Sequence, residues 1–285
     1  MHETEIRNYI DNDGNKIPSE LRLPRLTTDT HISVVIPAYN EKGYILNLLK
    51  HLDIQKIDKE FEIVVVDNGS TDNTTKVVHS SKLKHSTYTI QENSKGAGNA
   101  RKTGVDEIAR RLLERDIKKD ISKHFIIFTD ADTQPDQNWI SDIYDQLTST
   151  DESILLSGNY FASEAIDEKV YKATGIRNYF KSFALLSGLL DKYVGQTRMR
   201  GPNSALEIEC YIKVSGFRQP MDINGNTVPH ECFDLADRIA SVGLPVQHLD
   251  HPIIASQRRK LFEIISGISE GEEVQKVDYW NLNVK

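Results

Sequence analysis

Two carboxylates one residue apart follow an apolar run near the middle of the chain. The run Phe125–Phe128 has no polar alternation, which is typical of a strand buried on both faces of a parallel sheet, and Asp130 and Asp132 come just after it. Ligands of open α/β sheets bind at the carboxyl ends of strands. Hard carboxylate oxygens suit Mg²⁺ or Mn²⁺, which often share substrate phosphates. The pattern predicts a metal that holds a nucleotide diphosphate, with a plain polar turn before Pro135 as the alternative.

A second candidate for anion binding lies upstream of this pair. Lys95 and Arg101 flank a turn rich in small residues, and a helix is predicted from this turn towards Arg115. Gly96 and Gly98 would let either a phosphate or the neighbouring sheet approach the start of the helix. The two cations at the same turn favour an anion.

The first half of the chain alternates between apolar runs and helical periodicity. Strands are predicted at 32–36, 61–66, 88–91 and 125–128, each followed by a helix. This order predicts an α/β fold with a mostly parallel central sheet and helices on both faces. No G-x-G-x-x-G follows the first strand and no Walker A loop occurs, so the sequence excludes those two nucleotide sites.

The second half is less regular. We predict one domain over residues 31–285, preceded by a polar arm at 1–30 without a clear period. The domain would have a donor-nucleotide half (31–150), an acceptor half (151–260) and a C-terminal tail (261–285). The elements expected in the acceptor half are a strand at 154–157, a helix at 162–191, a turn at 200–205 running into a helix at 206–214, a helix from 230 to 242, and a strand at 246–249.

Composition narrows the class of protein. The 285 residues carry a net charge of -7, which argues against a nucleic-acid partner. No apolar run approaches the ~20 residues of a membrane span, and residues 1–25 contain no hydrophobic signal-peptide core. Cys210 and Cys232 do not make a disulfide framework. We expect a cytoplasmic protein without a transmembrane segment, and attachment to the inner membrane surface is left open.

Three motifs in the first half resemble the family 2 glycosyltransferases of the GT-A fold, the nucleotide-diphospho-sugar transferases. They are Val34–Glu41 (VVIPAYNE), Val65–Asp72 (VVDNGSTD) and Asp130-Ala131-Asp132, and the resemblance extends over about residues 32–259. It implies a GT-A sheet and metal-dependent, inverting transfer of a sugar from a nucleotide-diphosphate donor, with a UDP-sugar favoured. The acceptor would be the hydroxyl of a glycan, a lipid-linked saccharide or a small molecule.

The resemblance also implies roles for individual residues. Tyr39 would lie against the nucleobase and Glu41 near the ribose, while Asp67 would accept a hydrogen bond from the base. Asp132 would bind Mn²⁺ or Mg²⁺ directly, and Arg258 would clamp the diphosphate. The full expected sets are Pro37, Ala38, Tyr39, Glu41, Asp67, Lys95, Arg101, Asp130, Ala131 and Arg258 for the donor, Asp130, Asp132 and His251 for the metal, and Gly201 and Asn203 for the acceptor.

One position departs from the family pattern. The family usually opens its last helix with a Glu-Asp pair whose Asp is the base, whereas this chain has Glu231-Cys232-Phe233-Asp234. A thiol, with a reference pKa near ~8.5, is a poor substitute. We therefore take Glu231 as the base and Asp234 as the second candidate, although either carboxylate would also stabilise a helix N-terminus. The alternative is a non-catalytic nucleotide-sugar binding protein that has lost its base.

Overall fold

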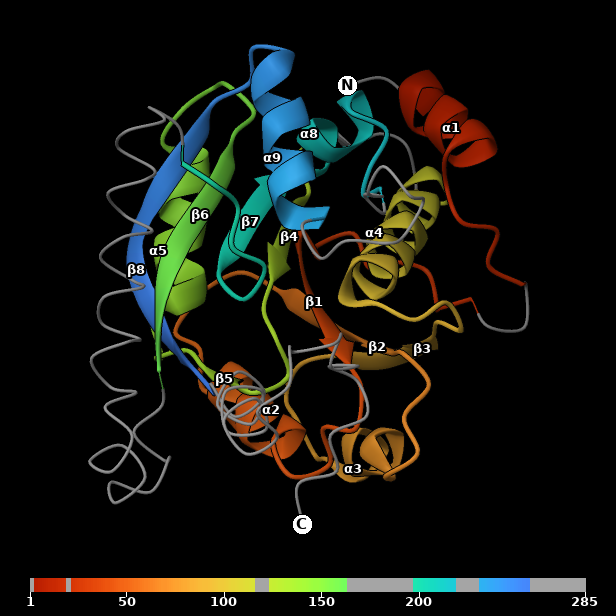
Figure 1. The fold of residues 1–285 in the computed structure, drawn as a ribbon, viewed down its shortest axis with the longest axis vertical. Helices are drawn as coiled ribbons and strands as arrows, with labels where there is room; N and C mark the ends of the chain where they lie inside the picture. The colour runs from red at the N-terminus through yellow and green to blue at the C-terminus, as the bar shows by residue number, and fades with distance from the viewer. Residues whose placement is uncertain (1–2, 19–21, 116–122, 163–196, 219–230, 257–285) are drawn as a thin grey trace, which may run out of the picture.

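The computed structural model describes residues 3–18, 22–115, 123–162, 197–218 and 231–256 (Figure 1). The strands are β1 Ile32–Ala38, β2 Phe61–Asp67, β3 Thr87–Gln91, β4 Phe125–Phe128, β5 Thr133–Gln134, β6 Leu155–Ala162, β7 Ser204–Glu207 and β8 Val246–Ala255. The helices are α1 Glu3–Asn12, α2 Ile45–Asp53, α3 Thr74–Ser80, α4 Ala97–Leu113, α5 Trp139–Thr148, α8 Ile208–Lys213 and α9 Glu231–Ser241. Residues 163–191 of the helix expected at 162–191, Arg258 and the C-terminal tail lie outside the described residues, and Ala162 ends β6.

The strands form one mixed sheet in the order β3-β2-β1-β4-β7-β6-β8-β5. The first four strands in the chain are parallel, and Ala38, Asp67 and Gln91 lie in register at the carboxyl ends of β1, β2 and β3. β6 and β8 are parallel to each other, while β7 runs antiparallel to both of its neighbours. The predicted α/β architecture with a mostly parallel sheet is confirmed.

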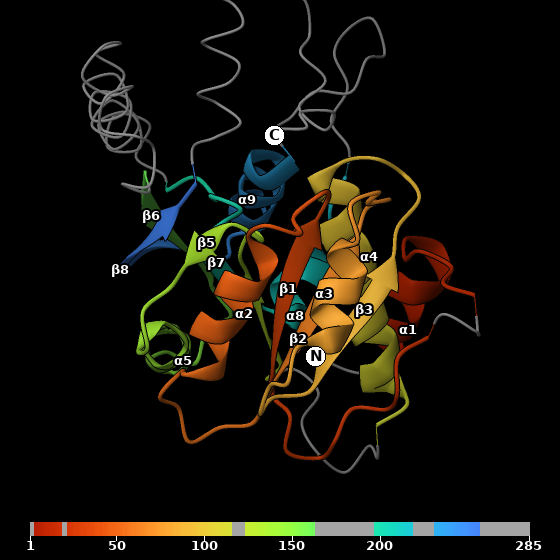
Figure 2. The ribbon, with the colours of Figure 1, turned by 90° about the horizontal axis from the view of Figure 1, so that it is seen from below.

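Helices cover both faces of the sheet, as expected from the apolar runs within its strands. Val35 of β1 joins the apolar cluster that α1, α4, α8 and α9 form on one face. Its neighbours Val34 and Ile36 join the cluster of α2, α3 and α5 on the other face. Figure 2 shows α2 and α5 to one side of β1, and α4 and α1 to the other.

Two predictions for the sheet were wrong. Residues 204–207 are a strand that fills the space between β4 and β6, and the helix begins only at Ile208. β1 also continues through Pro37, which was expected to end it. The backbone groups of Val35 and of the position of Pro37 point towards β4, but the pairing of β1 with β4 ends opposite Val35. A backbone N–H at position 37 would therefore have no partner in the sheet, so proline is tolerated there.

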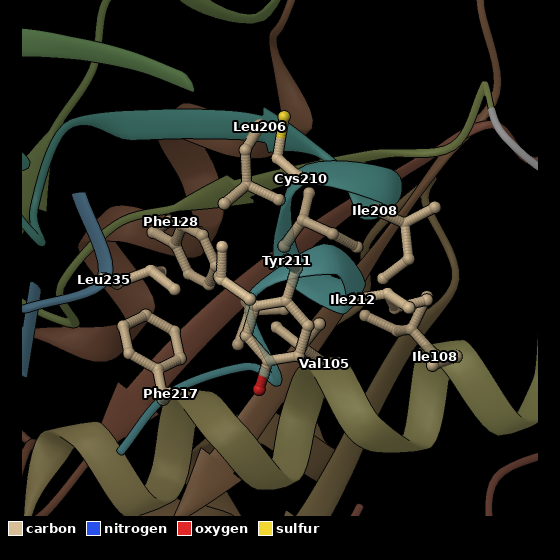
Figure 3. Close-up of a cluster of buried hydrophobic side chains, with 14 of the residues drawn as sticks. Val105, Ile108, Phe128, Leu206, Ile208, Cys210, Tyr211, Ile212, Phe217 and Leu235 are labelled. Carbon is tan, nitrogen blue, oxygen red and sulfur yellow. The ribbon is translucent and has the colours of Figure 1, made fainter. Parts of the chain in front are cut away.

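The N-terminal arm contains a helix that the sequence pattern did not predict. α1 buries only Ile6 and Tyr9, so its apolar stripe is short. Tyr9 packs edge-on against Tyr211 of α8, with ring centroids 5.7 Å apart. Figure 3 shows Tyr211 inside the apolar cluster, with its hydroxyl directed to α4, where it donates to Asp106 Oδ1 at 3.2 Å.

A buried polar network closes the opposite, amino-terminal edge of the parallel strands. Arg111 of α4 forms a bidentate ion pair with Glu62, with distances of 2.8 and 2.9 Å. Ser33 donates to Glu62 Oε1 at 2.7 Å and lies 2.9 Å from Nε2 of His124. Among the described residues, Nδ1 of His124 has no hydrogen-bond partner. Burial first, and then the positive charges of Arg115, His31 and Arg111, lower the pKa of His124 well below its ordinary 6.5.

This network predicts a loss of stability in mild acid. The unfolded chain takes up a proton at His124 below about pH 6.5 and the folded protein does not, so the free energy of unfolding should fall by about 2 kcal/mol between pH 7 and pH 5. Chemical denaturation of the wild type and of His124→Gln at both pH values measures this. The decrease should be smaller in His124→Gln, whereas His79→Gln, at an exposed histidine, should behave as the wild type. Equal decreases in all three proteins would contradict the assignment.

Candidate functional site at the carboxyl edge of the sheet

The loops that follow β1 and β2 are bound to each other at the carboxyl edge. Asn40, in a left-handed conformation with φ 55°, donates from its backbone to Ser70 Oγ and accepts at Oδ1 from the backbone N–H of Thr71. The backbone N–H of Glu41 donates to Thr74 Oγ1 at 2.8 Å. Tyr39 and Glu41 are buried, so both loops are packed and held in place.

Asp67 ends β2, and its two carboxylate oxygens have different surroundings. The residue is 2% exposed. Its Oδ2 accepts a long hydrogen bond from the backbone N–H of Ser70 at 3.3 Å, while Oδ1 has no partner among the described residues. A buried carboxylate oxygen without a donor is costly and rare in folded proteins. This oxygen is therefore ready to accept a hydrogen bond from a ligand.

The loop of residues 92–96, between β3 and α4, is fixed to the end of β2 by Asn68. The Asn68 amide donates to the carbonyls of Glu92 and Ser94 and accepts from the backbone N–H of Gly96 at 2.7 Å. Gly96 has φ 123°, a conformation open mainly to glycine. Lys95 is exposed on this loop, beside the start of α4.

Arg101 joins the centre of the edge to α9. Its Nη2 lies 2.6 Å from Asp130 Oδ1, and its Nη1 lies 3.0 Å from Glu231 Oε1. Arg101 is 3% exposed. The two carboxylates therefore occupy the ends of its guanidinium, and the arrangement favours a role for Arg101 in positioning them rather than the donor contact we predicted.

Two glycines make room for this ion pair. A Cβ on Gly201 would lie 2.6 Å from Nη2 of Arg101, and a Cβ on Gly98 would lie 2.7 Å from Cγ of Glu231. Gly201 was expected at an acceptor site, and its contact with the guanidinium gives another reason for a glycine there. Gly104 instead packs against Val35 of the sheet.

Cys232 lies next to the ion pair and is buried. Burial raises the pKa of its thiol to about 12, and the charges of Glu231 and Asp130 add to that effect against the opposing charge of Arg101. A neutral thiol cannot accept a proton near neutral pH. Cys232 therefore cannot act as a base near neutral pH, and Glu231 is the carboxylate next to it in the sequence.

Asp130 and Asp132 both lie in the loop after β4. Arg101 holds one oxygen of Asp130, whose side chain is 35% exposed, and the Asp132 carbonyl accepts from the backbone N–H of Ser256. No group of three or more His, Cys, Asp or Glu side chains in the described part of the chain could hold a metal. Two hard carboxylates fit a Mg²⁺ or Mn²⁺ ion that takes its remaining ligands from phosphate oxygens and water.

His251, expected as a third metal ligand, lies instead between two carboxylates near α5. Its Nδ1 is 2.6 Å from Asp142 Oδ2, and its Nε2 is 3.1 Å from Asp136 Oδ2. This geometry favours a role in holding β8 against α5.

Asn203, expected at the acceptor site, is fully buried and its amide is saturated. Its Nδ2 donates to the carbonyls of Asn159 and His251, both at 2.8 Å, and its Oδ1 accepts from Trp139 Nε1 at 2.9 Å. The side chain joins α5, β6 and β8, which favours a structural role over contact with an acceptor.

Asp234, the second candidate base, is bound by a neighbouring arginine. Its Oδ2 accepts from Nε and Nη2 of Arg238 at 2.9 and 2.7 Å, and Arg238 also donates to the carbonyls of Val214 and Gly216. Asp234 therefore orients the arginine that holds the end of α8.

Sequence reasoning missed Tyr160 on β6. Burial first, and then the charge of Asp130, raise the pKa of its hydroxyl, so this phenol lies within the electrostatic reach of the carboxylate loop. It lies beyond the strand predicted at 154–157 and within no motif, so the sequence gave no signal of function.

The close approach of Gly98 to α9 gives a stability prediction. Alanine normally stabilises a helix relative to glycine. Gly98→Ala should nevertheless lower the free energy of unfolding by about 1–3 kcal/mol, because the added methyl group would clash with Glu231. Gly43→Ala is the control, since a Cβ there has nothing within 4 Å. Urea denaturation compares the two variants. A Gly98→Ala protein as stable as Gly43→Ala would contradict the packing described.

Comparison with known proteins places the chain in a family. The model of the glycosyl transferase family 2 matches residues 33–202, more than half of the 285 residues. Glycosyltransferase GlyG of Streptococcus pneumoniae is 23% identical over 218 residues, 74% of this chain and 67% of that protein. Poly(ribitol-phosphate) beta-N-acetylglucosaminyltransferase TarS of Staphylococcus aureus is 33% identical over 113 residues, but the match spans only 18% of TarS.

Solved structures share the fold at low sequence identity. The crystal structure of S. aureus TarS residues 1–349 aligns with a TM-score of 0.52 at 18% identity, covering 83% of this chain and 64% of that one. Mannosyltransferase PcManGT from Pyrobaculum calidifontis, in complex with GDP-Man and Mn²⁺, aligns with a TM-score of 0.51 at 17% identity, covering 95% and 71%. No helix in the described residues is long and apolar enough to cross a membrane. The chain belongs to the glycosyl transferase family 2, a family of transferases, and has their GT-A fold.

Proposed function

We propose that the protein is a metal-dependent, inverting glycosyltransferase that takes a sugar from a nucleotide-diphosphate donor, preferably a UDP-sugar. The observation that carries this proposal is Oδ1 of Asp67, which is buried without a hydrogen-bond partner among the described residues, at the carboxyl edge of the sheet where the loop of Asp130 and Asp132 also begins. A carboxylate there can accept the N–H of a uracil ring. The acceptor is the hydroxyl of a glycan, a lipid-linked saccharide or a small molecule.

The donor occupies the loops after β1, β2 and β3. Tyr39 packs against the base, Glu41 lies near the ribose, and Pro37 and Ala38 shape the floor. Lys95, exposed on the loop of residues 92–96, approaches the diphosphate. The TarS structure in complex with UDP-GlcNAc, with a TM-score of 0.50, and the PcManGT structure with GDP-Man support a nucleotide-sugar at this fold, although they leave the choice of nucleotide open.

Asp130 and Asp132 hold a Mn²⁺ or Mg²⁺ ion. When bound, the ion offsets the negative charge that develops on the leaving diphosphate. The PcManGT structure with Mn²⁺ supports this choice of ion. Arg101 limits how Asp130 can turn, because it holds one of the two carboxylate oxygens.

Glu231 is the base that takes the proton of the acceptor hydroxyl. It stands at the start of α9 with its side chain 15% exposed, and Arg101 fixes one of its oxygens. Cys232 is excluded by its high pKa, and Asp234 is bound to Arg238. Direct displacement with such a base inverts the anomeric centre. The thiol at position 232 supports the second candidate function, a nucleotide-sugar binding protein without transferase activity.

Nucleotide binding tests the donor and metal sites together. We expect UDP to bind more tightly than GDP in a calorimetric titration, with Mn²⁺ strengthening the binding and EDTA weakening it. Asp132→Ala should lose the effect of Mn²⁺, while Asp151→Ala, at an exposed carboxylate away from the edge, should behave as the wild type. If neither nucleotide binds under any condition, the proposed function is wrong.

Turnover tests the assignment of the base. Glu231→Gln keeps an oxygen for Arg101 but cannot accept a proton, so we expect sugar transfer or donor hydrolysis to fall by about 10²–10⁴-fold with unchanged UDP affinity. Asp234→Asn is the matched control and should retain activity within a few-fold. A large loss of activity in Asp234→Asn with activity retained in Glu231→Gln would assign the base to Asp234. A wild-type protein that binds UDP yet turns over no UDP-sugar would establish the binding-protein alternative.

A further inference from the structure

The N-terminal segment, of which the structure describes residues 3–18 and 22–30, contacts α4 although the family match begins only at residue 33. Its contacts run from the second turn of the helix to its C-terminal end. Along α4 the paired groups are Asn15 with Thr103, Tyr9 and Asn15 with Asp106, the backbone of Leu23 with Glu107, the carbonyl of Pro24 with Arg111 and, just past the helix, the carbonyl of Thr28 with Arg115. The same helix carries Gly98 and Arg101 at its site end.

One of these contacts continues beyond α4 towards the candidate site. Thr103 is 3% exposed, and its hydroxyl accepts from Asn15 Nδ2 at 2.8 Å. The same hydroxyl donates to Glu92 Oε2. A threonine hydroxyl has a single proton to donate. Because the Asn15 amide donates to the hydroxyl oxygen, that proton points to Glu92.

Glu92 in turn organises the loop of residues 92–96. Its Oε1 accepts from the backbone N–H of Ser94 at 2.5 Å. Its own backbone N–H donates to the carbonyl of Asp67 at 2.9 Å, and its carbonyl accepts from Asn68. The carboxylate of Glu92 thus connects α4 to the loop that presents Lys95 and runs beside Asp67.

We propose that Asn15, Thr103 and Glu92 form a positioning relay, through which the N-terminal segment orders the loop of residues 92–96 for nucleotide binding. The three are positioning residues, since they act through the backbone of that loop. Without the relay, the bonds from Asn68 still hold the loop but less firmly, so part of its ordering must occur when the ligand binds, and this cost weakens affinity. The effect on affinity rests on the proposed nucleotide site, while the ordering of the loop does not.

Two pairs of variants isolate the relay. Thr103→Val removes the hydroxyl at nearly constant shape, whereas Thr103→Ser keeps it. Asn15→Ala removes the amide that directs the proton, whereas Asn12→Ala removes an exposed amide whose contact is with Asn8 of its own helix. Hydrogen exchange of residues 92–96 and calorimetric UDP affinity with Mn²⁺ are measured for each, together with melting temperature.

Thr103→Val and Asn15→Ala should speed exchange in residues 92–96, leave exchange in β1 unchanged, and weaken UDP binding by about 3- to 10-fold, the effect of one such hydrogen bond. Thr103→Ser and Asn12→Ala should match the wild type. Unchanged loop exchange in both relay variants, or faster exchange with unchanged UDP affinity, would overturn the proposal. If the wild type binds no nucleotide, the proposed function fails separately, and loop exchange alone decides whether the relay exists.

Discussion

The geometry of the candidate site depends on the buried guanidinium of Arg101. It joins α4, the loop after β4 and the start of α9, which are far apart in the sequence. Burial opposes its charge, but the negative charges around it outweigh that effect and raise the pKa of Arg101. Removing one partner of such a buried pair leaves an uncompensated charge, which is more costly than the pair itself. The ion pair therefore restricts where Asp130 and Glu231 can lie.

The strands β1, β2 and β4 of the donor half were predictable because each contains a run of apolar residues, Val34–Ile36, Ile63–Val66 and Phe125–Phe128. Such runs indicate strands buried on both faces, and parallel strands bring their carboxyl ends together, which places Asp67 and Asp130 at one edge without any knowledge of distances. The family motifs fall at these same ends. Fold and candidate donor site thus follow from patterns local in the sequence.

The remaining features depend on contacts that no local pattern records. β7 has only four residues, of which two are apolar, and it runs directly into α8, so strand and helix are indistinguishable until the pairing with β4 and β6 is known. Asn203 is polar in a turn-like stretch, a typical surface signal, yet it is buried and saturated by partners from three elements. Arg101 was recognised as a cation, but not as a cation held by two carboxylates.

The same charge balance bears on the thiol at position 232. Arg101 supplies one positive charge and already faces two carboxylates, so an ionised aspartate at position 232 would add a third negative charge in a buried setting. A neutral thiol avoids that repulsion. The residue that departs from the family pattern is thus compatible with the charges around it, and the carboxylate that remains beside it, Glu231, is the one that Arg101 orients. The charges around Arg101 thus fit both a neutral side chain at position 232 and a fixed carboxylate at Glu231.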